Sequence, residues 1–188
     1  PDSPNLRMLA ATVNERQRQA YLAPYVAGQT ISAIGISEPG AGADPAGMIT
    51  RAVRDGEDWV INGRKIWISR AEEADFTILM AVTDKEKGAR GGMSAFLVDK
   101  GTPGFNVLRK IPMIGGQATY EVALEDCRVE GWKLLGEEGH GFAPMQLRLG
   151  TRRIEMASWS IGMAQRALDM ICEYAPQRKT FGLPLSER

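Results

Sequence analysis

The spacing of hydrophobic and polar positions changes twice along the chain. Residues 6–25 mix spaced apolar residues with Asn, Glu, Arg and Gln, which favours one helix or two short helices, ended by Pro24 and Gly28. From residue 31 to 129, short runs of β-prone residues alternate with turn residues. Helical spacing returns after residue 142. The pattern therefore predicts a mainly β domain with flanking helices.

The central region contains eight β-prone runs, which predict an antiparallel β barrel or sandwich. The dipeptides Asp55-Gly56 and Asn62-Gly63 are predicted tight turns, and the first joins two of the runs as a hairpin. The runs cover residues 31–36, 49–53, 59–61, 65–69, 76–82, 93–98, 105–108 and 120–124.

A single apolar stripe follows the later helical region. Its members recur at spacings of three and four, which predicts one amphipathic helix of about six turns. They are Ile154, Ala157, Ile161, Ala164, Leu168, Ile171 and Ala175.

Composition narrows the function classes. Lys and Arg number 23, as do Asp and Glu, so charge gives no reason to expect nucleic acid or an anionic membrane as a partner. No apolar run approaches the roughly 20 residues of a membrane span, and no signal peptide is evident. Cys127 and Cys172 lack metal spacing, and His140 is the only histidine, so no metal site is expected. We expect thiols of the cytoplasm or another reducing compartment.

Candidate chemistry begins with the run 35–47, Gly-Ile-Ser-Glu-Pro-Gly-Ala-Gly-Ala-Asp-Pro-Ala-Gly. Four glycines and two prolines follow a predicted strand, so backbone N–H groups are available to a ligand such as a cofactor phosphate. The run has neither the Gly-x-Gly-x-x-Gly spacing of a Rossmann turn nor the ending of a P-loop. Within it, Glu38 and Asp44 are predicted to bond backbone amides.

This run resembles the signature of the flavin-dependent acyl-CoA dehydrogenase family, except that Ala43 stands where the family has Ser or Thr. Three further stretches resemble family motifs in the same order: Asn-Gly-Arg-Lys-Ile-Trp-Ile-Ser at 62–69, Leu-Glu-Asp-Cys-Arg-Val at 124–129, and Arg-Lys-Thr-Phe-Gly at 178–182, a helix-end motif. The resemblance spans nearly the whole chain, but family members are considerably longer.

The resemblance implies three parts of a larger enzyme. Residues 1–30 would end an N-terminal helical domain, residues 31–140 would form the middle β-barrel domain, and residues 141–188 would start a truncated C-terminal helical domain. It also implies FAD as cofactor. The flavin-contacting residues implied in the middle domain are Ile36, Ser37, Gly42, Ala43, Trp67, Ile68 and Ser69.

Two of these positions also have plainer interpretations. Local sequence alone allows Ser37 either to cap the glycine turn or to contact the flavin. Trp67 and Ser69 share a face of an extended strand, and a strand Trp is by itself more often a core residue. The resemblance favours the flavin for both.

Residues near the C-terminus are implied in a shared site. Arg178, Thr180 and Phe181 resemble residues that reach the flavin of a neighbouring subunit, which implies a homo-oligomer. The alternative is a cationic helix C-terminus stopped by glycine. Ala43, Gly150 and Arg153 are implied near the substrate, and a surface salt bridge is the alternative for Arg153.

The implied reaction is α,β-dehydrogenation of an acyl-CoA thioester in fatty acid metabolism, with hydride transfer to FAD and an electron-transfer protein as acceptor. Some family members place the catalytic Glu where this chain has Arg152, which cannot act as a base, and Glu155 is predicted to be a solvated charge. The base is therefore expected outside this chain, and the isolated chain inactive. The alternatives are an acyl-CoA oxidase or other flavin oxidase or monooxygenase, or a cofactor-free β-barrel assembly module.

Overall fold

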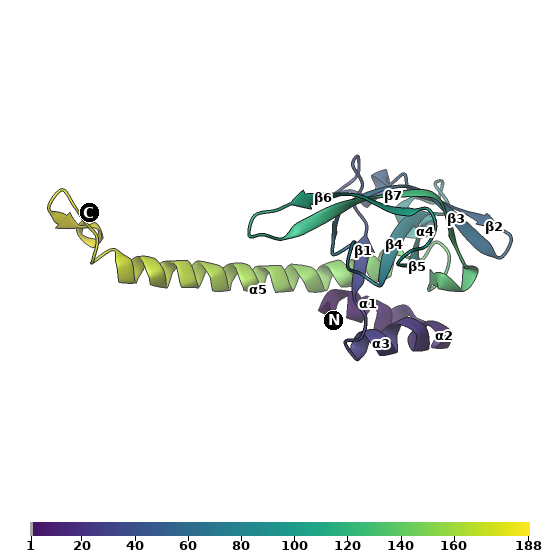
Figure 1. The fold of residues 1–188 in the computed structure, drawn as a ribbon, viewed down its shortest axis with the longest axis horizontal. Coiled ribbons are helices and arrows are strands. Elements are labelled where there is room, and N and C mark those ends of the chain that lie inside the picture. The colour runs from purple at the N-terminus through teal and green to yellow at the C-terminus, as the bar shows by residue number, and fades with distance from the viewer. Residues whose placement is uncertain (1) are drawn as a thin grey trace. The chain divides into compact units, whose positions relative to one another are not determined.

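The structure is a computed structural model that describes residues 2–188. The chain forms two compact units, the first ending at Arg148 and the second running Leu149–Arg188. The first unit holds the N-terminal helices and a large sheet, and the second holds most of a long helix and a small hairpin (Figure 1). Mainly β structure with flanking helices is therefore confirmed.

The N-terminal region is broken into short helices, as the prediction of two short helices allowed. A capping box starts the second of them: the Asn14 side chain accepts a hydrogen bond from the Gln17 amide at 2.9 Å, and the Gln17 side chain accepts one from the Asn14 amide at 3.2 Å. The Tyr21 ring packs edge-on against Phe76 of the sheet, with centroids 5.0 Å apart. The helices are α1 Ser3–Thr12, α2 Glu15–Gln17, the π-helical η1 Arg18–Leu22 and α3 Ala23–Val26.

The eight-stranded sheet has the order β6-β7-β3-β2-β4-β5-β8, with β1 paired to β4. Most neighbours are antiparallel, as predicted, but β1 and β2 both run parallel to β4. The strands are β1 Ser32–Gly35, β2 Arg51–Asp55, β3 Asp58–Ser69, β4 Phe76–Val82, β5 Met93–Asp99, β6 Phe105–Pro112, β7 Ala118–Val129 and β8 Leu134–Leu135. The short helices between them are η2 Pro45–Gly47, α4 Gly88–Gly92 and η3 Gly131–Lys133.

The two parallel pairings explain where the glycine-rich run lies. The last residue of β1, Gly35, pairs with Leu79, and the Thr50 carbonyl accepts a hydrogen bond from the Val82 amide at 2.8 Å. Two segments of the chain thus lie along the same edge of β4. The first leaves it at Leu79, and the second joins it at Val82, three residues further along β4. The fourteen residues between them, 36–49, must therefore leave the sheet as a loop.

The Asn62-Gly63 dipeptide forms no turn, which corrects the prediction. The chain runs on through β3, and the pairing with β7 shifts register between Ile61 and Gly63. Gly63 has φ +152° and lies so close to Thr50 that a Cβ there would sit 2.4 Å from the Thr50 Oγ1. Glycine is needed here for a bulge and a close backbone approach. The predicted Asp55-Gly56 hairpin is confirmed by the pairing of β2 with β3.

The core of the first unit includes two buried clusters. One surrounds Trp59, whose ring packs against Phe96 with centroids 5.3 Å apart. The other contains Ile68, Tyr120 and Val122 and lies where β3 pairs with β7. Burial of this apolar surface is the main force that holds the sheet together.

The second unit contains helical and hairpin structure. Helix α5 spans Phe142–Tyr174, which makes it longer than the predicted helix of about six turns. Ile154, Ile161, Leu168 and Ile171 of the predicted stripe are 54–71% exposed. After the helix come β9 Lys179–Thr180, β10 Leu183–Pro184 and η4 Leu185–Glu187. Among residues 2–188, no helix combines the length and apolar character that crossing a bilayer requires.

Gly104→Ala should destabilise the first unit more than Gly101→Ala. Both glycines have positive φ, +85° and +81°, so both substitutions carry backbone strain. At Gly104, however, the added Cβ would also lie 2.3 Å from the Glu125 carbonyl oxygen, whereas nothing lies within 4 Å at Gly101. We expect an extra loss of about 1–3 kcal/mol in the free energy of unfolding, measured by urea denaturation. Equal losses would contradict this packing.

Candidate functional site

The glycine-rich loop presents free backbone amides to solvent. A short bridge closes its first turn: the Glu38 amide donates to the Ala41 carbonyl at 2.7 Å, and the Ala41 amide donates back at 3.1 Å. Gly42 and Ala43 follow on the surface, and their amides donate no hydrogen bond to any described residue. These N–H groups are therefore available to an external acceptor.

Gly42 is not required by the packing of the chain itself. Its φ is not positive, and a Cβ there would meet nothing within 4 Å; the same holds for Gly40. Neither strain nor a close internal contact thus accounts for these glycines. A cradle that must stay clear for a ligand does account for them.

A buried ion pair, not anticipated from the sequence, anchors this loop. Lys65 Nζ donates to Glu38 Oε1 at 2.8 Å, and neither side chain is more than 2% exposed. The Glu38 carboxylate also accepts from the amides of Ile49 at 2.7 Å and Thr50 at 2.9 Å. The prediction that Glu38 bonds backbone amides is confirmed, as it is for Asp44, which accepts from the Ala46 amide at 2.9 Å.

Both members of the pair are charged at neutral pH. Burial alone would raise the pKa of Glu38, but the Lys65 charge and the hydrogen bonds from Lys65, Thr50 and Ile49 lower it overall. Burial lowers the pKa of Lys65 to about 8, although the Glu38 charge and hydrogen bond act in the opposite direction.

The structure brings Ser37 next to the segment that contains Trp67. The Ile66 amide donates to the Ser37 carbonyl at 2.9 Å, which ties the start of the loop to β3. The side chains of Ser37 and Ser69 form no hydrogen bond with any described residue, so Ser37 does not cap the turn through its hydroxyl. Trp67 is 56% exposed and is not a core residue.

Trp67 departs from the regular strand that was predicted. Its φ is +63°, a left-handed conformation that is costly for an aromatic residue, and the pairing with β7 shifts register between Lys65 and Ile68. Trp67 and Ser69 are still both exposed, on either side of the buried Ile68. Such strain at an exposed aromatic residue is typical of functional sites.

The remaining candidates in the first unit contribute in other ways. Ile36 is half-buried, and its carbonyl accepts a hydrogen bond from Lys65 Nζ at 3.1 Å. The Ile68 side chain belongs to the core, and the residue as a whole is 1% exposed. Thr119 was missed by the sequence analysis: it pairs with Ser69 across the sheet, and its buried Oγ1 has no partner among the described residues.

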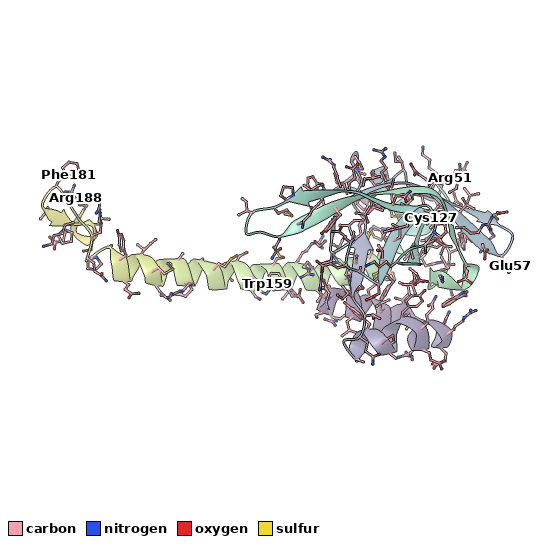
Figure 2. All side chains as sticks on the ribbon, in the orientation of Figure 1. Arg51, Glu57, Cys127, Trp159, Phe181 and Arg188 are labelled. Carbon is pink, nitrogen blue, oxygen red and sulfur yellow. The ribbon has the colours of Figure 1, made fainter. Side chains whose placement is uncertain are left out.

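In the second unit, the stretch 178–182 forms a hairpin, and its interpretation as a helix C-terminus is wrong. Helix α5 has already ended at Tyr174, and Thr180 pairs with Leu183. The two residues between them, Phe181 and Gly182, both have positive φ, as a type I′ turn requires. Figure 2 shows the Phe181 and Arg188 side chains at this hairpin, where the Arg188 guanidinium lies 5.0 Å from the Phe181 ring centre. The Phe181 side chain is 93% exposed.

The substrate candidates of the second unit lie on α5. Gly150 is half-buried, and a Cβ there would meet nothing within 4 Å. Arg153 is exposed and forms no ion pair with a described residue, so the predicted alternative of a surface salt bridge is not observed. Glu155 instead pairs with Arg152, whose Nη1 lies 2.9 Å from Glu155 Oε2.

Other polar groups outside the candidate site include His140 and the lining of a polar cleft. Across residues 2–188, no group of three or more His, Cys, Asp or Glu side chains is placed to hold a metal ion. His140 is exposed and contacts the Glu138 carbonyl through Nδ1 at 2.9 Å. A polar cleft of about 430 Å³ includes none of the candidates. It is lined by Arg16, Arg54, Glu57, Asp58, Glu130, Gly131 and Trp132.

One thiol per folded chain should react with Ellman's reagent at neutral pH. Cys172 is exposed, whereas burial encloses Cys127 and raises the pKa of its thiol to about 11. We expect Cys172→Ala to remove the reaction and unfolding in guanidinium to restore it through Cys127. Rapid labelling of Cys127 in the folded Cys172→Ala chain would contradict the buried position of β7.

Comparison with known proteins agrees with the motifs. Residues 33–127 match the model of the acyl-CoA dehydrogenase middle domain, and residues 139–188 match that of the acyl-CoA dehydrogenase C-terminal domain. The (R)-benzylsuccinyl-CoA dehydrogenase of Thauera aromatica is 44% identical over 100% of this chain and 47% of its own length. The chain thus spans about half the length of the curated relatives it matches.

Solved structures share the same fold. Butyryl-CoA dehydrogenase from Megasphaera elsdenii superposes with a TM-score of 0.88 and 36% identity, covering 99% of this chain and 49% of its own. A glutaryl-CoA dehydrogenase from Mycobacterium smegmatis in complex with FADH2 superposes with a TM-score of 0.85 and 31% identity, covering 98% and 46%. With the middle-domain model matching more than half of its residues, the chain belongs to the acyl-CoA dehydrogenase family.

Proposed function

We propose that this chain is the flavin-binding segment of a longer, FAD-dependent acyl-CoA dehydrogenase, which oxidises an acyl-CoA thioester to its α,β-unsaturated form. The observation that carries the proposal is the arrangement in the first unit. Free amides at Gly42 and Ala43, two unpaired hydroxyls and an exposed, strained Trp67 belong to segments joined by the hydrogen bond between Ile66 and Ser37. The solved relative bound to FADH2 supports the choice of flavin.

Each group has a role that its chemistry suits. The amides of Gly42 and Ala43 would bind the FAD pyrophosphate, since clustered N–H groups favour anions. Ser37 and Ser69 would donate to the polar edge of the ring system, and Trp67 would cover a face of it. Ile36 and Ile68 would contribute main-chain atoms, because the Ile68 side chain is in the core. Bound FAD supplies the acceptor for the substrate hydride.

The second unit would complete the enzyme. Arg178, Thr180 and Phe181 would reach the FAD of a neighbouring subunit in a homo-oligomer, and the exposed Phe181 ring at the hairpin tip suits such a contact. Gly150 and Arg153 of this unit would contact the substrate, and Ala43 is the substrate contact proposed in the first unit. An electron-transfer protein would reoxidise the flavin, in the cytoplasm or another reducing compartment.

In this enzyme, residues 1–30 would end an N-terminal helical domain and residues 31–140 would form the middle β domain. Residues 141–188 would only begin the C-terminal helical domain. Glu155 is paired with Arg152, so it is not a free base. The base that removes the α-proton would then be supplied by sequence outside these 188 residues.

Anaerobic mixing with butyryl-CoA and longer acyl-CoA thioesters tests this function. The longer protein with bound FAD should lose its flavin absorbance as the substrate is oxidised, whereas the 188-residue chain with added FAD should not. Turnover by the 188-residue chain would contradict the missing base. A flavin-loaded longer protein that no acyl-CoA thioester reduces would contradict dehydrogenation.

A further inference from the structure

Ser37 lies between two contacts made by a single ammonium group. Lys65 Nζ donates to the Ile36 carbonyl at 3.1 Å and to the Glu38 carboxylate at 2.8 Å, which are the groups immediately before and after Ser37. Lys65 itself precedes Trp67 by two residues in β3. One buried side chain thus connects the segment containing Ser37 to the segment containing Trp67.

The Glu38 carboxylate connects the two ends of the glycine-rich loop. Its oxygens accept from the amides of Ile49 and Thr50, where the loop rejoins β4, while Glu38 itself stands near the loop's start. The loop residues between them, including Gly42 and Ala43, are largely exposed and have little packing of their own. The ion pair and the buried side chain of Met48 therefore anchor the loop.

General stability does not account for this pair. A buried ion pair must overcome the desolvation of both charges, and well-packed apolar residues of similar size usually stabilise a core as well or better. Trp67, next to it, holds a left-handed backbone conformation. A strained conformation persists only when surrounding structure enforces it. Lys65, held by two hydrogen bonds from Nζ, enforces the path of the chain just before the bulge.

We infer that the Glu38–Lys65 pair is a positioning element, which fixes Ser37, the loop and Trp67 in the one mutual arrangement that binds the flavin. Apart from the Ile36 carbonyl, which accepts from Lys65 Nζ, the pair touches no proposed flavin group, and it acts through its neighbours. This inference rests on the proposed function. A readout that does not depend on FAD is therefore needed to test the Glu38–Lys65 pair separately from flavin binding.

Fluorine NMR of the chain labelled with 5-fluorotryptophan provides that readout. The chain has four tryptophans, and Trp67→Phe assigns the resonance of Trp67. The double variant Glu38→Gln/Lys65→Met removes both charges and keeps similar side-chain sizes. We expect it to fold and to shift or broaden the Trp67 resonance, while the Trp159 resonance stays in place. If the double variant does not fold, Glu38→Gln alone gives the same comparison.

Lys133→Met is the matched control. Lys133 is largely buried, pairs with Asp99 and Glu130 at 2.8 Å each, and lies 5.5 Å from the Trp132 ring. Its loss should move the Trp132 resonance and leave that of Trp67 unchanged. An unmoved Trp67 resonance in the folded Glu38 or Lys65 variant would overturn the inference.

Measuring FAD affinity then tests whether the position of Trp67 matters for flavin binding. We expect the double variant to bind FAD about 10- to 100-fold more weakly than the native chain, the range seen when groups that orient metal ligands are removed. Lys133→Met should bind FAD as the native chain does. Unchanged FAD affinity in a double variant whose Trp67 has moved would overturn the inference. A native chain that binds no FAD contradicts the proposed function instead, and the Trp67 resonance still decides whether the pair positions this residue.

Discussion

Lys65→Met alone should lower the free energy of unfolding by about 3–5 kcal/mol at neutral pH, the usual loss when one partner of a buried ion pair is removed. The substitution leaves the Glu38 carboxylate buried with two backbone amides and no counter-ion. The expected loss therefore reflects an uncompensated charge, because methionine fills most of the volume of the lysine stem. Urea denaturation followed by circular dichroism measures it.

The loss should shrink as the pH falls. In the native chain the pKa of Glu38 is lowered, so its contribution to stability is present above the unfolded value of 4.5 and is lost as the pH drops through the folded value. In Lys65→Met, burial without the lysine raises the pKa of Glu38, so the folded state takes up a proton first and gains stability on acidification. The two chains should thus converge toward acid pH.

An exposed lysine serves as control for this prediction. Lys87 pairs with Asp84 at 3.0 Å, but its side chain is 68% exposed, so Lys87→Met should leave the free energy of unfolding close to that of the native chain. Similar losses for the two variants, or a Lys65→Met deficit that is independent of pH, would contradict the buried ion pair.

Trp59→Ala should destabilise the first unit by about 3–5 kcal/mol, the usual cost of truncating a large buried aromatic residue. Trp59 is 2% exposed and packs edge-on against Phe96 in the main core cluster. Its buried Nε1 has no hydrogen-bond partner among residues 2–188. Trp59→Phe removes that unsatisfied donor and keeps an aromatic ring, so it should retain most of the stability that alanine loses.

The same denaturation experiment separates the two substitutions of Trp59. Both variants should keep the native dependence of unfolding free energy on urea, since the same surface is exposed on unfolding. A phenylalanine variant as unstable as the alanine variant would contradict the account of this core, because it would mean that the indole N–H has a partner.

Local patterns were sufficient to predict most of the sheet. Alternating β-prone runs and the Asp55-Gly56 turn depend on neighbouring residues, and the corresponding strands and hairpin formed. Asn62-Gly63 has the local signature of a turn, but its glycine serves a close approach to Thr50, a contact distant along the chain. The two-residue strand β8 offers too few residues for any pattern.

In the candidate site, contacts between residues distant along the chain were again not predictable from local sequence. Motif resemblance identified the loop and the Trp67 segment, but the Glu38–Lys65 pair joins residues 27 apart, and neither position by itself indicates burial of a charge. The local pattern predicts a regular strand at Trp67. The left-handed φ of this residue results from the bulge against β7, and no adjacent glycine signals that bulge in the sequence. Likewise, the hairpin at Phe181 and Gly182 was masked by a local pattern typical of helix ends.

Titration of the 188-residue chain with FAD, followed by flavin fluorescence, tests most directly whether the first unit carries the flavin contacts. Trp67→Ala should weaken binding by about tenfold or more, the scale expected for a buried stacking residue. Trp159→Ala is the matched control, because Trp159 is 54% exposed against 56% for Trp67 and lies in the second unit. Saturable binding that weakens only in Trp67→Ala is the predicted result. No binding by the native chain, or equal binding by both variants, would contradict it.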